Sequence, residues 1–172
     1  MTATVQRVAD LRLRSSAGPT RTRVWWPVAP DDGVPTGLLL FFVDATVDAP
    51  WLRELASLAQ LVVVAAPCAH GPDAVVRASR RDAAIALEWA ADHAHQLEAD
   101  RGRLFVGGIG IGAALAEAAV AEADEQGWPP LAGRILIPLD DYDELDGDRL
   151  ARDLAHRLRA CGSSSAIRPT DA

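Results

Sequence analysis

RLFVGGIGIGAALA, residues 103–116, is the stretch that decides the fold predicted from this sequence. Its apolar beginning, Leu104 to Val106, predicts a short buried strand, and the small residues from Ala113 to Ala123 predict a helix. The turn between them holds Gly107, Gly108, Gly110 and Gly112 and leaves no room for a loop. Such a sharp turn brings backbone N–H groups and the positive end of the helix dipole to one point, where an anion or a nucleophile can sit.

The tip of this turn carries no reactive side chain, because it is formed by Ile109, Gly110 and Ile111. Gly108, Gly110 and Ala113 also match G-x-G-x-x-A, the dinucleotide fingerprint, at a strand-to-helix junction. That fingerprint normally follows the first strand of a domain, whereas several predicted strands precede it here. The glycines are equally explained by a turn that needs positive φ and a closely packed helix.

Length and composition predict one globular domain, which we assign to residues 1–162, followed by a flexible C-terminal tail at 163–172. Cys68 and Cys161 lie far apart and in no metal-binding spacing, so we expect neither a disulfide framework nor a zinc site. No apolar run approaches the roughly 18 residues of a membrane span, and the N-terminus lacks a signal-peptide core. We therefore expect a cytoplasmic protein without a membrane partner.

The charge of the chain excludes two further classes of function. A net charge of −7 and a pI near 5.0 argue against a nucleic-acid partner, because phosphate binding needs clustered positive charge. All 17 basic residues are arginine, which excludes Schiff-base chemistry on a lysine. The sequence indicates no cofactor.

The first part of the chain predicts a hairpin followed by a βαβ unit. Val8–Arg14 and Thr22–Val28 alternate apolar and polar residues around a turn, which is typical of an antiparallel hairpin that ends at Pro27. Leu38–Val43 is a continuous apolar run, as in a strand covered on both faces. A helix, WLRELASLAQ, then leads directly into a second apolar run, Leu61–Ala66.

The second part predicts helices on both sides of the strand at 104–106. A long helix follows Asp73, its expected N-cap, and the spacing of Ile85, Trp89 and His93 by four predicts that it packs on the sheet. After the central turn come a strand, Arg134–Leu139, and an amphipathic helix that stops near Gly162.

Strands that alternate with helices after a hairpin predict an α/β fold with a mainly parallel, doubly wound sheet. In such sheets ligands bind outside the carboxyl ends of the strands, which we call the rim. The residues expected around the rim are Asp44, Thr46, Cys68, His70, Gly108 to Gly112 and Asp140 to Asp143. Among them, the expected ligand-binding residues are Asp44, Thr46, Gly108, Ile109, Gly110 and Ile111.

Six segments, in order, resemble the hormone-sensitive-lipase-like esterases of the α/β-hydrolase fold. They are RVWWP (23–27), LLLFFV (38–43), APCAHGP (66–72), DAAIALEW (82–89), DRGRLFVGGIGIGA (100–113) and PPLAG with the apolar strand up to Asp140. The resemblance covers residues 8–141 and implies that family's fold.

The catalytic parts of that family have no match in this sequence. Gly110 stands where members carry the serine nucleophile, and Val43 to Thr46 stand where they carry a His-Gly-Gly-Gly oxyanion segment. We expect a truncated fold without the last two strands, which deliver the acid and the histidine in the family. Asp143 is the alternative counterpart of the acid.

Three functions follow as hypotheses. The first is a catalytically degenerate α/β-hydrolase-like protein that binds a small hydrophobic ligand or a protein partner. The second is a hydrolase or lyase for a small ester-like or hydrophobic substrate, with Cys68, His70 and Asp143 as weak catalytic candidates beside Thr46. The third is a nucleotide-binding module that uses the glycine turn.

Each catalytic candidate also has a purely structural interpretation. Cys68 and His70 lie two residues apart in a loop, a spacing that rarely holds catalytic geometry. The acidic run at 140–148 lacks the EF-hand spacing, which favours a solvated loop over a metal site. Finally, Arg134–Leu139 would form an open sheet edge, blunted by Pro138, so we expect a homo-oligomer or hetero-complex through that edge.

Overall fold

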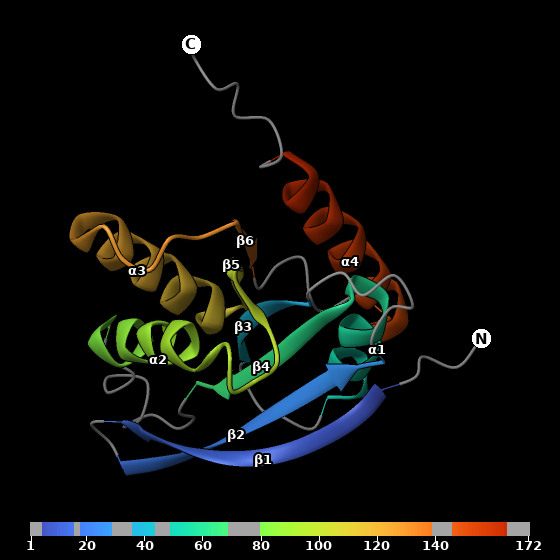
Figure 1. The fold of residues 1–172 in the computed structure, drawn as a ribbon, viewed down its shortest axis with the longest axis horizontal. Coiled ribbons are helices and arrows are strands. Elements are labelled where there is room, and N and C mark those ends of the chain that lie inside the picture. The colour runs from blue at the N-terminus through green and yellow to red at the C-terminus, as the bar shows by residue number, and fades with distance from the viewer. Residues whose placement is uncertain are drawn as a thin grey trace.

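Strands and helices alternate along most of the chain in the computed structural model, which describes residues 5–15, 18–28, 36–43, 49–68, 80–138 and 146–164 (Figure 1). The elements in chain order are β1 (Val5–Ser15), β2 (Gly18–Pro27), β3 (Gly37–Val43), α1 (Pro50–Ala59), β4 (Leu61–Pro67), α2 (Arg80–His93), β5 (Asp100–Ile109), α3 (Ile111–Gln126), β6 (Gly133–Ile137) and α4 (Gly147–Ser164).

The described strands form a six-stranded sheet in the order β1-β2-β4-β3-β5-β6. β3, β4, β5 and β6 are parallel to one another, whereas β1 and β2 form an antiparallel hairpin that joins the sheet through β4. The predicted α/β fold with a mainly parallel sheet and an N-terminal hairpin is therefore confirmed. So is the βαβ unit, because β3 and β4 are parallel neighbours joined through α1.

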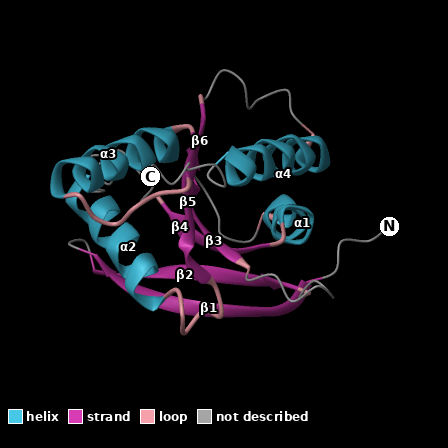
Figure 2. Cartoon of the chain, turned by 45° about the horizontal axis from the view of Figure 1, so that its top comes forward, coloured by secondary structure: helices cyan, strands magenta, loops and turns pink. Residues whose placement is uncertain are grey.

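Two cores lie on opposite faces of the sheet, with α1 and α4 on one face and α2 and α3 on the other (Figure 2). β3 contributes to both, since Leu39 and Phe41 pack with α1 and α4 while Leu38 and Leu40 pack with α2 and α3. This alternation explains why the run is apolar at every position: both faces of the strand are covered.

Local sequence signals explain the bounds of α1. Pro50 occupies the first turn, where its missing N–H costs no helical hydrogen bond. Gln60 adopts the left-handed conformation at the C-terminus, with φ of 54°, and its backbone N–H bonds the Ala56 oxygen. Leu52 and Leu55 are fully buried against the sheet. The chain therefore passes from α1 into β4 without a loop.

α2 packs on the sheet through a different face from the one predicted. Ile85 is 43% exposed, and Trp89 and His93 are only half-buried, with the Trp89 and His93 rings stacked 4.7 Å apart. The buried side chains are Ala83, Ala84, Leu87, Ala90 and Ala91. A row of alanines lets the helix axis approach α3 and the sheet closely, and this packing outweighs the larger apolar side chains. Asp73 lies outside the described residues.

Several element ends also differ from the prediction. β5 begins at Asp100 rather than Leu104, because the Asp100 N–H bonds the Thr36 oxygen at 2.6 Å and extends the ladder. α4 continues to Ser164, past Gly162. The assignment of residues 163–172 to a tail stays a prediction. β6 ends at Ile137, just before Pro138, and pairs only with β5 in the described sheet. Assembly through that edge stays a prediction too.

Candidate functional site

The carboxyl ends of the four parallel strands meet at one edge of the sheet. Val43 of β3 pairs with Pro67 of β4, and Ile109 of β5 pairs with Ile137 of β6. Two further backbone bonds tie the ends together: the Cys68 N–H donates to the Val43 oxygen at 2.7 Å, and the Gly110 N–H donates to the Ile137 oxygen at 2.9 Å. The rim expected from the sequence thus exists for its described members.

Gly110 forms the turn from β5 into α3. Its φ of 59° and ψ of −121° place it in a region that side-chain-bearing residues rarely adopt. It is the N-cap of α3, and no side chain caps the helix. The first N–H groups of α3 therefore rely on other partners, and the positive end of the helix dipole points at the same place.

Gly108 and Gly112, on either side of the turn, are required by close packing. A Cβ at Gly108 would overlap the Gly112 backbone, and a Cβ at Gly112 would overlap the carbonyl oxygen of Phe42 in β3. Both obstacles are backbone atoms, which cannot rotate away. These two glycines are explained by the contact between α3 and the sheet, without a bound nucleotide.

The two isoleucines of the turn point into opposite cores. Ile109 is 4% exposed and packs with α1 and α4, whereas Ile111 is half-buried against the α2 and α3 side. The tip itself therefore presents backbone at Gly110 rather than a large side chain. Ligand binding by these residues stays a prediction, and it would use the N–H groups more than the Ile109 side chain.

Only one of the predicted catalytic candidates lies within the described residues. Cys68 is 3% exposed and packs in the core under α2. His70 and Asp143, like the ligand-binding candidates Asp44 and Thr46, lie outside the described residues. Their roles stay predictions.

The described histidines lie away from the turn. His93 and His95 follow α2, close to the start of β5, which is the opposite end of the strand from Gly110. His156 is on the exposed side of α4. Within the described ranges, no imidazole is therefore placed to act as a base at Gly110.

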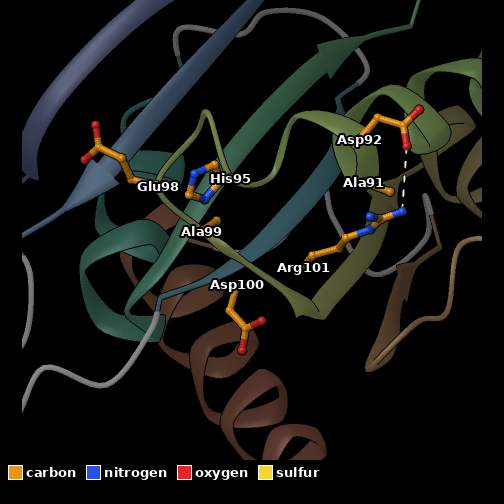
Figure 3. Close-up of a pocket in the computed structure, with 7 residues that line it drawn as sticks. All are labelled: Ala91, Asp92, His95, Glu98, Ala99, Asp100 and Arg101. Atoms are coloured by element: carbon orange, nitrogen blue, oxygen red, sulfur yellow. Dashed lines mark ion pairs between the residues drawn. The ribbon is translucent and has the colours of Figure 1, made fainter.

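A surface hollow of about 480 Å³ lies near the start of β5, at the opposite edge of the sheet from the rim (Figure 3). It is lined by Ala91, Asp92, His95, Glu98, Ala99, Asp100 and Arg101. Arg101 pairs with Asp92 at 3.8 Å and lies over the Trp128 ring, and Glu98 pairs with Arg7 at 2.9 Å. These charges have partners within the chain, so the hollow shows no set of groups arranged for catalysis.

A family model described as alpha/beta hydrolase fold matches residues 40–162. The chain belongs to the α/β-hydrolase fold family. This membership explains the geometry at Gly110, because hydrolases of this family place a serine in G-x-S-x-G on a sharp strand-to-helix turn. Residues 108–112 read G-I-G-I-G, so Gly110 occupies the serine position between the two packing glycines. The spacing of these three glycines was the sequence signal for this frame.

The relatives of this hydrolase chain are esterases. Esterase LipI of Mycobacterium tuberculosis is 31% identical over 137 residues, which are 76% of this chain and 43% of LipI. An esterase structure from Pyrobaculum calidifontis has a TM-score of 0.61 and 27% identity, covering 73% of this chain and 42% of that one. The thermostable carboxylesterase EstE1, cloned from a metagenomic library, has a TM-score of 0.69 over 94% of this chain and 78% of its own, at 18% identity. The chain thus spans less than half the length of LipI.

The helices of this hydrolase chain were also compared with the dimensions of a bilayer. Among the described helices, none combines the length and the apolar character that a membrane crossing requires.

Proposed function

We propose that this chain is a catalytically degenerate α/β-hydrolase that binds a small hydrophobic ligand or a protein partner at its rim and does not hydrolyse esters. The observation that carries the proposal is Gly110, which stands in the serine position of the turn with the backbone geometry of that turn retained. A glycine cannot attack a carbonyl carbon, because it has no side-chain oxygen or sulfur.

The size of this loss argues for binding rather than slow hydrolysis. Removing the nucleophile of a serine protease lowers kcat on the order of a millionfold. The backbone groups around the turn remain, including the N–H of Ile111, the residue after the serine position, which this motif uses as an oxyanion donor. Backbone donors beside apolar strand ends can hold a carbonyl or carboxylate group without reacting with it.

The esterase relatives make ordinary hydrolysis the competing function. A non-standard site would need an accessible nucleophile, and Cys68, the described candidate, is almost fully buried. This burial favours the degenerate interpretation over a cysteine-dependent hydrolase.

The test is an assay of freshly purified protein with short-chain 4-nitrophenyl esters, run beside titration calorimetry with ethyl butyrate. We expect no turnover above that of buffer, and heat from binding of the ester. Gly110→Ser is expected to stay inactive, because a serine without a base at hydrogen-bonding distance is a weak nucleophile. Gly110→Ala is the matched control for the effect of a side chain at this φ.

Two results would contradict the proposal. Turnover at an enzymatic rate by the unaltered protein, lost in Cys68→Ala or His70→Ala, would establish a non-standard active site. Turnover by Gly110→Ser but not by Gly110→Ala would mean that a competent base and oxyanion hole are present and that only the nucleophile has been replaced.

A further inference from the structure

One face of the β1–β2 hairpin carries four arginines and one aspartate, a set that we call the arginine face. Asp10 and Arg12 of β1 lie opposite Arg23 and Arg21 of β2 in the antiparallel register, and Arg14 follows on the same face of β1. Arg12, Arg14 and Arg21 are exposed, and Arg23 is partly exposed. This local excess of positive charge stands in a chain whose net charge is −7.

The arginine face already binds one carboxylate. Asp10 accepts bonds from Arg23 Nε at 2.6 Å and Arg21 Nη2 at 2.7 Å, among others. Hydrogen bonds from Arg23 and then Arg21 hold the pKa of Asp10 far below its usual range. The planar guanidinium groups are thus oriented so that a carboxylate is bound by two arginines at once.

The rest of this face has no such carboxylate. Arg12 stands directly opposite Arg21, a cross-strand pair of like charges that destabilises a sheet. Within the part of the chain that the structure describes, no acidic side chain pairs with Arg12 or Arg14. A carboxylate supplied from outside would relieve this repulsion as Asp10 does one register position away.

A second cluster has the opposite sign, and we call it the acidic end. It consists of Glu54 on α1 with Asp146 and Asp148 at the start of α4. Partial burial and the neighbouring Asp148 raise the pKa of Glu54, Asp146 adds to this, and Arg152 opposes it in part. Asp146 and Asp148 are exposed. These carboxylates repel one another and would be stabilised by added positive charge.

We propose that the arginine face of one copy of this chain docks on the acidic end of a second copy. The two clusters lie on different parts of the molecule: the hairpin forms the lower border in Figure 1, and α4 lies at the upper right. Each cluster holds like charges that the other neutralises, and arginine forks bind carboxylates with two parallel bonds. This surface involves none of the groups at the turn, so the proposal stands independently of the function proposed for the rim.

Sedimentation velocity of the purified chain tests the docking first. At about 0.05 M salt we expect a species larger than the monomer. At about 1 M salt, where the Debye length is only about 3 Å, the association constant is expected to fall at least about tenfold. A monomer at both salt concentrations, over the whole concentration range that can be measured, would overturn the proposal.

Two charge-reversed proteins then identify the surfaces. Arg12→Glu/Arg14→Glu makes the arginine face acidic, and Asp146→Arg/Asp148→Arg makes the acidic end basic. Each protein alone is expected to be monomeric at low salt, because both of its surfaces now carry the same sign. The matched control is Arg80→Glu/Arg81→Glu, which makes the same charge change at exposed positions at the start of α2 and should associate as the unaltered chain does.

Mixing the two reversed proteins is the decisive measurement. In the mixture, the reversed face of one protein meets the reversed end of the other with opposite charge, so association should return, again weakened by salt. Far-UV circular dichroism of each protein alone checks that both are folded. A mixture of folded proteins that stays monomeric, or loss of association in the Arg80/Arg81 control, would show that these two surfaces do not meet.

Discussion

Replacing Gly112 by alanine separates the two effects that a helical glycine can have on stability. Helix propensity alone predicts that alanine is better than glycine by about 0.5–1 kcal/mol. The structure predicts the opposite sign, because the added methyl would overlap the Phe42 carbonyl oxygen and force α3 away from β3. Overpacking of this kind costs typically about 1–3 kcal/mol, so Gly112→Ala should lower the free energy of unfolding by about that amount.

Urea unfolding followed by tryptophan fluorescence measures this change. For a chain of this size, each kcal/mol corresponds to a fall in Tm of roughly 2–4 °C. Gly127→Ala is the control, since Gly127 has a φ of 68° and nothing within 4 Å of the position of its Cβ. It should lose about 1 kcal/mol from backbone strain alone. If Gly112→Ala is as stable as the unaltered chain, or more stable, the close contact between α3 and β3 is wrong.

Two other predictions concern packing and charge in the helices. Leu87→Ala should cost about 2–5 kcal/mol, because Leu87 is buried between α2 and the sheet, whereas Ile85→Ala should stay within about 0.5 kcal/mol; equal losses in urea unfolding would restore the face predicted from spacing. Glu54→Gln should stabilise the chain at neutral pH. The folded state raises the pKa of Glu54, so its charged form costs stability above that pKa and costs none once the carboxyl is protonated in both states. The gain should therefore vanish as the pH of the urea experiment falls below about 4, and a gain that persists there would have another cause.

Much of the candidate site could be predicted from the sequence. The rule that ligands bind beyond the carboxyl ends of parallel strands placed Cys68 and Gly110 at the same edge, and the register confirms that the strands end there together. Accessibility could not be predicted in the same way. Cys68 and Ile109 proved to be buried, because the direction of a side chain at a strand end depends on which helices cover each face.

The sequence by itself determined the order of strands and helices and the position of the glycine turn. Those features follow from local rules: an apolar run marks a strand covered on both faces, and close packing without a side chain leaves no choice but glycine at 108 and 112. The sequence also determined that Gly110 stands in the serine position, since that depends only on spacing within one turn.

Only the tertiary structure decided which segments became neighbours. β4 lies between β2 and β3, α2 packs through alanines rather than through Trp89, and Arg12 faces Arg21 across the hairpin. Periodicity reports that a residue is buried but not against what, because one apolar face can pack on several partners with similar free energy. The choice among them depends on how all the elements fill space together.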